Sequence, residues 1–388
     1  MVFCRFLYIT LYNVLQHNKE SNIMRELKIG GLNIPVPVVQ GGMGVGISMS
    51  GLASAVANQG GVGVISAAGL GMVHRNPALD YLQANIEGLR TEIRKAKEKT
   101  EGIIGVNVMV AMTNFADLVR TSISEKVDII FSGAGLPLQL PDFLKDGGTT
   151  KLVPIVSSGR AAKLICDKWK TLYDYLPDAF VVEGPKAGGH LGFKKDQIED
   201  TQYSLEELIP QVVKEVQVFE QKYGREIPVI AAGGIYTGRD MFNIMQKGAK
   251  GVQIGTRFVT TEECDADIGF KMAYVNALES DMEIIQSPVG MPGRAVRNEF
   301  IDKIKQGLKK PIKCPFHCIK TCDVSSSPYC IITALYNAYK GNMKGGYAFA
   351  GSNAYLADKI TTVKEIFNEL IEDFHKTINH SNSADQQA

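Results

Sequence analysis

One histidine stands among glycines in a stretch that reads E-G-P-K-A-G-G-H-L-G-F, from Glu183 to Phe193. A predicted strand over residues 179–182 ends just before it, so His190 lies on a loop with few bulky neighbours. An imidazole changes its charge near neutral pH, which makes His190 a candidate general base or hydrogen-bond donor. A loop histidine that only caps a turn is the structural alternative.

A second set of residues could hold a phosphate. Between Pro228 and Phe258, two short β-branched runs each end in glycine, at Gly233-Gly234 and at Gly255, with a helical pattern between them. Glycine has no Cβ, so a ligand can approach the backbone amides of residues 233–235 and 255–256. One such turn is explained by a tight strand-to-helix connection, but two turns in consecutive units favour a phosphate-binding site.

The elements that must position these residues alternate regularly along the chain. Strand-like apolar runs are predicted at residues 36–40, 62–66, 103–108, 127–131, 152–156, 179–182, 229–232 and 252–254. Helical patterns separate them, at residues 49–59, 77–99, 115–122, 138–145, 159–170, 205–223 and 239–246. This alternation predicts an α/β fold of the TIM (β/α)8 barrel type, with an open doubly wound sheet as the alternative.

The active face of such a barrel lies at the carboxyl ends of its strands. Seven of the eight predicted strand ends carry a glycine, so this rim should expose main chain to a flat ligand such as a flavin. The predicted rim includes Gln40, Gly41, Gly42, Met43, Asn107, Glu183, Gly188, Gly189, Gly233, Gly234, Gln253, Ile254, Gly255 and Thr256.

The composition narrows the possible partners. A net charge of +1 over 388 residues gives no electrostatic reason to bind nucleic acid or an anionic membrane. No apolar run reaches the roughly 18 residues that span a bilayer. Seven cysteines, an odd number in a long chain, favour reduced thiols and a cytoplasmic location. The oligomeric state is left open by the sequence.

The chain is predicted to have four parts. Residues 1–23 form an apolar N-terminal extension, and translation starting at Met24 would leave it out; a membrane-surface anchor is the alternative. Residues 24–261 form the barrel, which residues 346–378 complete with a closing helix. Residues 262–345 form a mainly helical insertion that acts as a lid, and residues 379–388 form a tail.

The insertion carries several features of its own. Helical patterns cover residues 262–279 and 300–308, and residues 288–297 are predicted to form an irregular basic loop. Arg294 and Arg297 in that loop could bind an anion, although solvation at the surface is the more common role of such residues. After the insertion, Tyr347 and Phe349 could return to the barrel mouth, with Asn353 and Tyr355 near the flavin. Packing of these residues in the core is the alternative.

Four cysteines, Cys314, Cys318, Cys322 and Cys330, follow an x3, x3, x7 spacing with His317 among them. The spacing is compatible with a zinc or iron–sulfur site. It differs from the usual zinc pattern, in which closely spaced pairs are separated by longer gaps. We therefore expect packed thiols and no metal ligands, and the role of these cysteines is left open.

Six motifs in order resemble the nitronate monooxygenase family, formerly called 2-nitropropane dioxygenases. They are Q-G-G-M (40–43), G-V-N-V-M (105–109), S-G-A-G-L-P (132–137), A-G-G-H (187–190), A-A-G-G-I (231–235) and Q-I-G-T-R-F (253–258). The same set resembles the flavin-type enoyl-acyl-carrier-protein reductases. Each motif is weak alone, and the joint match over residues 35–298 is specific.

The resemblance implies a TIM barrel that binds FMN non-covalently. It places Asn107, Glu183, Gly188, Gly234 and residues 253–256 at the cofactor, and His190 beside the flavin ring. A nitronate monooxygenase would pass electrons from a nitronate through the flavin to O2, giving a carbonyl compound and nitrite. A reductase would instead use NAD(P)H to reduce an enoyl thioester, and a barrel that binds a phosphorylated ligand without turnover is a third possibility. Glu183, where many relatives have Gln, and Pro185-Lys186 before the A-G-G-H motif depart from the family pattern and bear on substrate preference.

Overall fold

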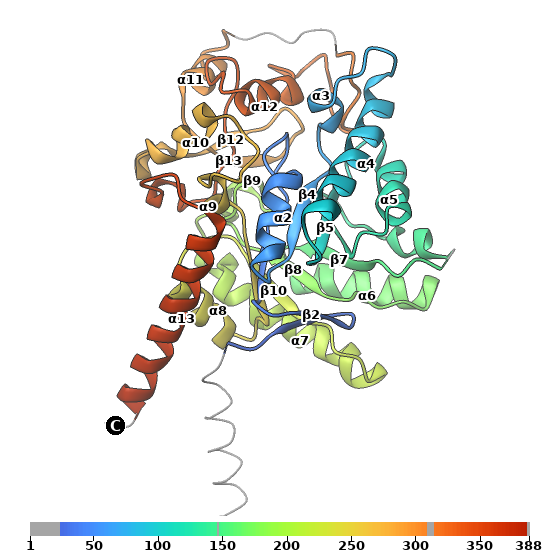
Figure 1. Cartoon of the computed structure of the whole chain (residues 1–388), viewed down its shortest axis with the longest axis vertical. Helices are drawn as coiled ribbons and strands as arrows, with labels where there is room; N and C mark the ends of the chain where they lie inside the picture. The colour runs from blue at the N-terminus through green and yellow to red at the C-terminus, as the bar shows by residue number, and fades with distance from the viewer. Residues whose placement is uncertain (1–23, 146, 309–313, 386–388) are drawn as a thin grey trace, which may run out of the picture.

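A computed structural model describes residues 24–145, 147–308 and 314–385 (Figure 1). The predicted N-terminal extension, residues 1–23, lies outside the described residues. The chain folds into a barrel with an insertion at one of its ends. The hairpin of β1 (Leu27–Ile29) and β2 (Leu32–Ile34) lies at the opposite end in Figure 1.

Eight parallel strands form the barrel. They are β3 (Val38–Gln40), β4 (Gly63–Ser66), β5 (Ile104–Met109), β6 (Ile129–Gly133), β7 (Lys151–Val156), β8 (Phe180–Glu183), β10 (Val229–Ala232) and β11 (Gly251–Ile254). Hydrogen bonding runs in the order β3-β11-β10-β8-β7-β6-β5-β4. The ring closes between β3 and β4, where Val62 N donates to Val38 O over 2.9 Å and Val39 bridges to Val62. The predicted TIM barrel is confirmed.

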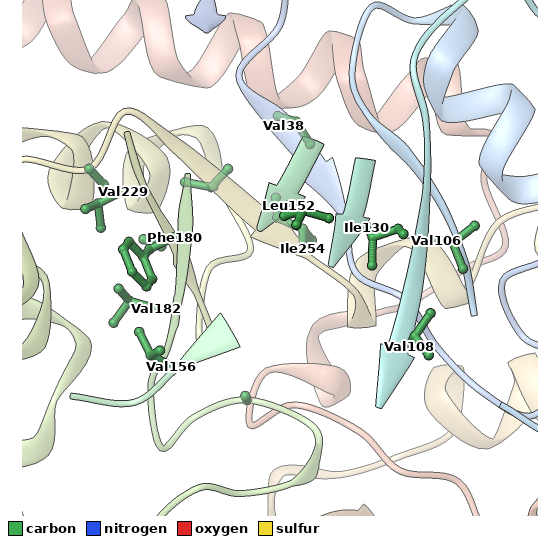
Figure 2. Close-up of a cluster of buried hydrophobic side chains, with 14 of the residues drawn as sticks. Val38, Val106, Val108, Ile130, Leu152, Val156, Phe180, Val182, Val229 and Ile254 are labelled. Atoms are coloured by element: carbon green, nitrogen blue, oxygen red, sulfur yellow. The ribbon is translucent and has the colours of Figure 1, made fainter. Parts of the chain in front are cut away.

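Alternation along each strand divides the apolar side chains into two cores. In β6, Ile129 and Phe131 join the cluster that fills the barrel interior and contacts the β1–β2 hairpin, whereas Ile130 joins the cluster packed against the helices. Figure 2 shows part of this outer cluster, with Leu152 and Phe180 on the next two strands. Because successive strand residues point to opposite faces, continuous β-branched runs bury both faces at once.

The helices that cover the barrel follow the predicted pattern closely. They are α2 (Ser50–Asn58), α3 (Leu70–Val73), α4 (Tyr81–Lys99), α5 (Phe115–Ser124), α6 (Gly159–Tyr173), α7 (Leu205–Tyr223) and α8 (Gly238–Gln246). The helix predicted at residues 138–145 is wrong, since only the 3-10 turn η1 (Leu140–Leu144) forms there. Pro141 explains the difference, because a proline disfavours the α conformation in the residue before it.

The insertion contains both helices and strands. The short helix α9 (Thr256–Val259) follows the last barrel strand and precedes the insertion. The elements of the insertion are α10 (Ile268–Val275), β12 (Met282–Gln286), β13 (Pro292–Val296), α11 (Glu299–Lys305) and α12 (Ile331–Tyr339). The irregular loop predicted at residues 288–297 is wrong over its second half, where β13 pairs with β12 and with the two-residue strand β9 (Gly189–His190). Two prolines and two glycines in this stretch hide the strand signal, and its partners are distant in sequence.

The barrel closes with α13 (Val363–Asp385), which packs against α8 and α2. It is the long helix drawn in red at the edge of the barrel in Figure 1. The helix continues beyond residue 378, so the predicted tail begins as helix. Within the described ranges, none of the helices combines the length and apolar character needed to cross a membrane.

Candidate active site

A cavity of about 670 Å³ opens at the carboxyl ends of the barrel strands. Its wall is formed largely by the loops that follow the strands, together with residues of the insertion. The predicted rim residues that line it are Gly41, Gly42, Met43, Asn107, Glu183, Gly188, Gly189, His190, Gly233, Gly234, Gln253, Ile254, Gly255 and Thr256. The structure thus brings together residues that the sequence separates by more than 200 positions.

Gln40 is the exception among the predicted rim residues. Its side chain is fully buried and does not line the cavity. Its Oε1 accepts a hydrogen bond from Val64 N over 2.9 Å, and its Nε2 donates to Gly41 O. Gln40 therefore joins β3 to β4 where the barrel closes. The side chain thus has a structural role, and its contact with a cofactor stays a prediction.

His190 lies in β9, where its backbone pairs with Gly293 of β13. Its Nε2 is 2.7 Å from the hydroxyl oxygen of Ser287, a buried residue between β12 and β13. The edge-on ring of Phe349 packs against the imidazole, with 5.0 Å between centroids. Burial lowers the pKa of His190 to about 4, so the imidazole is neutral at pH 7. The side chain is held in place and lines the cavity.

Glu183 ends β8 and lines the same cavity. Burial raises the pKa of its carboxyl to about 7. No hydrogen-bond or ion-pair partner of this carboxyl lies within the described part of the chain. A carboxyl in this state can be protonated near neutral pH, which is the condition expected of a group at a reactive site.

The first of the two glycine turns has a backbone conformation that few residues other than glycine adopt. Gly233 and Gly234 have φ angles of +100° and +81°, in the left-handed region that favours glycine. The segment after the insertion fixes both turns: Asn353 Nδ2 donates to Gly234 O over 2.9 Å, and Gly351 N donates to Thr256 Oγ1 over 2.9 Å. The two turns are therefore held by a shared neighbour.

The A-G-G-H loop approaches this same segment closely. A Cβ added to Gly188 would lie 2.6 Å from both Ala350 C and Gly351 N, which real Cβ atoms do not tolerate. Glycine at position 188 thus permits the contact between the histidine loop and residues 350–351. Phe349, which the sequence placed near the barrel mouth as one possibility, does line the cavity, whereas Tyr347 is fully buried beside it.

Two arginines of the β12–β13 region have separate roles. Arg294 is buried and Nη2 donates to Pro185 O over 3.0 Å, so it supports the histidine loop from behind. Burial lowers the pKa of its guanidinium. Arg297 pairs with Asp302 at the surface. Neither arginine lines the cavity. The expected solvated surface position is confirmed for Arg297 and is wrong for Arg294, which is buried.

Sequence reasoning missed Ser287. It stands in the run S-P-V-G-M-P-G-R, which carries only turn signals. Its proximity to His190 depends on pairing between β13 and β9, which lie about a hundred residues apart. An observation that β13 is a strand would have been needed to find it.

Comparisons with known proteins find a matching family model and several relatives. The family model described as nitronate monooxygenase matches residues 25–373. A Mycobacterium tuberculosis (strain ATCC 25618 / H37Rv) protein named (3aS,4S,5R,7aS)-5-hydroxy-7a-methyl-1-oxo-octahydro-1H-indene-4-carboxyl-CoA dehydrogenase is 30% identical over 278 residues, which cover 72% of this chain and 68% of the relative. A probable nitronate monooxygenase of Staphylococcus aureus (strain Newman) is 28% identical over 297 residues, covering 71% of this chain and 79% of the relative.

Solved structures share the fold over most of the chain. FabK from Thermotoga maritima matches with a TM-score of 0.69 and 28% identity, covering 90% of this chain and 95% of that one. A nitroalkane oxidase from Streptomyces ansochromogenes matches with a TM-score of 0.67 and 21% identity, covering 89% and 98%. The second likeness concerns the fold alone.

Proposed function

The chain belongs to the nitronate monooxygenase family of oxidoreductases, and on that premise we propose that it is an FMN-dependent enzyme that oxidises alkyl nitronates with O2. The products would be a carbonyl compound and nitrite. Bound FMN would supply the redox chemistry, accepting electrons from the substrate and delivering them to O2.

The residues of the cavity suit FMN. The volume of about 670 Å³ is within the range of cofactor sites. Glycines form much of the rim, so a flat ring can lie against main chain. The amides of residues 233–235 and 255–256 would hold the single phosphate without a charged side chain. Asn107, Glu183 and Gly188 would line the ring, as the family resemblance implies.

One observation carries the choice of substrate: His190 is a neutral imidazole in the cavity wall. A base with a pKa of about 4 removes protons poorly at pH 7, so it suits a substrate that is already deprotonated. A nitronate is such an anion. A neutral imidazole can donate one N–H to a nitronate oxygen, and Ser287 Oγ, 2.7 Å from Nε2, positions the ring.

The variant His190→Ala tests this role. We expect it to retain flavin and to lose most of its nitronate oxidation, because it lacks the donor in the cavity wall. His375→Ala, at an exposed position of α13, is the matched control and should keep wild-type activity. Wild-type rates in His190→Ala with flavin bound would refute the assignment.

An enoyl-thioester reductase that takes hydride from NAD(P)H is the second candidate. Two observations favour it: the likeness to FabK at 28% identity, and the relative named as a carboxyl-CoA dehydrogenase. Mixing the protein with NADH or NADPH without O2 separates the candidates. Bleaching of the flavin at the rate of turnover would support the reductase, whereas bleaching by a nitronate and none by NAD(P)H would support the monooxygenase.

A barrel that binds a phosphorylated ligand without turnover is the candidate from another class. Denaturing the purified protein would release no flavin in that case. Release of FMN together with turnover of either substrate excludes it.

A further inference from the structure

Lys186 is the one lysine or arginine among the described residues that line the active-site cavity. It is exposed, and its ammonium forms no hydrogen bond or ion pair with another residue that the structure describes. The one acidic residue in the same wall is Glu183, and burial raises the pKa of its carboxyl to about 7. An unpaired cation in the wall of a cavity attracts an anion.

The side chain of Lys186 lies against the first glycine turn. A Cβ added to Gly234 would lie 3.0 Å from both the Cβ and the Cδ of Lys186. The methylene stem of the lysine therefore covers the open side of this turn. Because the ammonium is only two bonds beyond Cδ, it can reach a ligand bound to the amides of residues 233–235.

The backbone of Lys186 lies beside the second turn. A Cβ added to Gly351 would lie 2.7 Å from Thr256 Oγ1 and 3.4 Å from Lys186 O, so these two residues meet at Gly351. Ser352 N donates to Lys186 O over 3.0 Å and fixes this carbonyl. Lys186 is thus adjacent to both of the turns that we propose to hold a phosphate.

The loop that carries Lys186 is held on both sides of this residue. The ring of Pro185 restricts its backbone, and its carbonyl accepts a hydrogen bond from Arg294 Nη2 over 3.0 Å. On the other side, Ala187 N donates to Gly184 O over 3.1 Å. A side chain on a fixed backbone loses less conformational freedom when it binds a ligand.

Two other charged groups near the turns are already paired. Asp240 Oδ2 accepts from Tyr236 N over 3.0 Å and from Thr237 N over 2.8 Å, at the start of α8. Arg257 Nη1 donates to Tyr236 O over 2.7 Å, and its Nη2 pairs with Glu369. Neither Asp240 nor Arg257 lines the cavity. The amides of the turns would therefore give a phosphate hydrogen bonds but leave its charge of about −1.5 to −2 uncompensated.

We propose that Lys186 forms an ion pair with the phosphate of bound FMN and makes the site prefer FMN to a flavin without phosphate. The inference rests on the proposed FMN site and extends it, because the two turns supply hydrogen bonds and Lys186 supplies the compensating charge. A lysine suits this role, since its ammonium is a compact charge on a flexible stem. A lysine that is only solvated would affect the binding of neither flavin.

The test titrates FMN into flavin-free full-length protein and follows the flavin fluorescence. We expect Lys186→Gln to raise the Kd of FMN about tenfold at low salt, the effect of one hydrogen bond between charged groups. The difference should shrink in about 1 M salt, because salt screens an exposed ion pair. Lys186→Arg keeps the charge and should bind FMN more tightly than Lys186→Gln.

Riboflavin separates the phosphate from the ring. It has the same ring system and no phosphate, so its Kd should be the same for Lys186→Gln and wild type. Unchanged riboflavin binding also shows that the variant has folded. Lys195→Gln is the matched control, since it removes the same charge at an exposed position that is close in sequence and does not line the cavity. This control should bind FMN as the wild type does.

Three results would overturn the proposal and leave the FMN site intact. They are equal FMN affinities of Lys186→Gln and wild type, equal losses of FMN and riboflavin affinity in Lys186→Gln, and the same loss of FMN affinity in Lys195→Gln. A wild-type protein that binds no FMN would overturn both this inference and the proposed function. FMN binding that depends on Lys186, in a protein that oxidises no nitronate, would refute the proposed function alone.

Discussion

Replacing Glu183 by glutamine tests the electrostatics of the cavity. Its carboxyl ends β8 in the cavity wall, and burial raises its pKa to about 7 from 4.5. The folded protein therefore binds this proton more tightly than the unfolded chain does. The resulting stability is fully present below pH 4.5 and is lost as the pH rises through 7. Glutamine does not ionise, so Glu183→Gln should not lose this stability as the pH rises.

The size of the effect follows from the two pKa values. The interval from 4.5 to about 7 corresponds to about 3 kcal/mol at roughly 1.4 kcal/mol per pH unit. Water in the open cavity screens the charge, so we expect a gain of about 1–3 kcal/mol for Glu183→Gln at pH 8. Near pH 4 the two proteins should be equally stable, apart from any constant difference in packing.

Trp169 makes the measurement simple. It is the one tryptophan of the chain and is fully buried in α6, so its fluorescence reports unfolding in urea. Unfolding curves of flavin-free protein from pH 4 to 8 give the difference between variant and wild type. Glu365→Gln is the control, and its effect on stability should have the opposite sign. Hydrogen bonds from Thr361 and Thr362 lower the pKa of Glu365 to about 2, so its carboxylate stabilises the fold at neutral pH and its replacement should destabilise it. A Glu183→Gln difference that is the same at every pH would refute the reasoning.

Three further predictions concern the histidine loop. His190→Gln should lose less stability in acid than the wild type does. Burial lowers the pKa of His190 to about 4, so the wild-type protein loses stability as the pH falls from 6.5 to 4, whereas glutamine does not titrate. Unfolding curves of both proteins over this pH range would show the difference. Ser287→Ala should lower kcat about fivefold with FMN affinity unchanged, since one hydrogen bond of about 1 kcal/mol to the imidazole is lost; weaker FMN binding in titrations would contradict a positioning role. Gly188→Ala should weaken FMN binding, because the added Cβ would lie 2.6 Å from Ala350 C. Gly224→Ala is the control, since its backbone is strained but the added Cβ would meet open space. Equal FMN affinities of the two variants would contradict the steric argument.

The fold was largely predictable because its signals are local. Each barrel strand is a short β-branched run, and α7 begins and ends at the predicted residues, 205 and 223. The carboxyl ends of parallel strands meet at one rim, so the residues that follow each predicted strand could be assigned to the cavity wall. Gln40 shows the limit of this reasoning. It belongs to the same motif as Gly41 and Gly42, yet the direction of its side chain depends on the closure between β3 and β4.

Features formed by distant pairing were not predictable. The strand β13 is stabilised by β12 and by the histidine loop, so its own residues, rich in glycine and proline, carry little strand signal. Ser287 reaches His190 only through that pairing.

A crystal structure of the purified protein with its flavin tests the central claim most directly. We predict FMN in the cavity, with its phosphate hydrogen-bonded to the amides of residues 233–235 and 255–256 and its ring beside the His190 imidazole. A flavin bound elsewhere, or an imidazole turned away from the ring, would contradict the account.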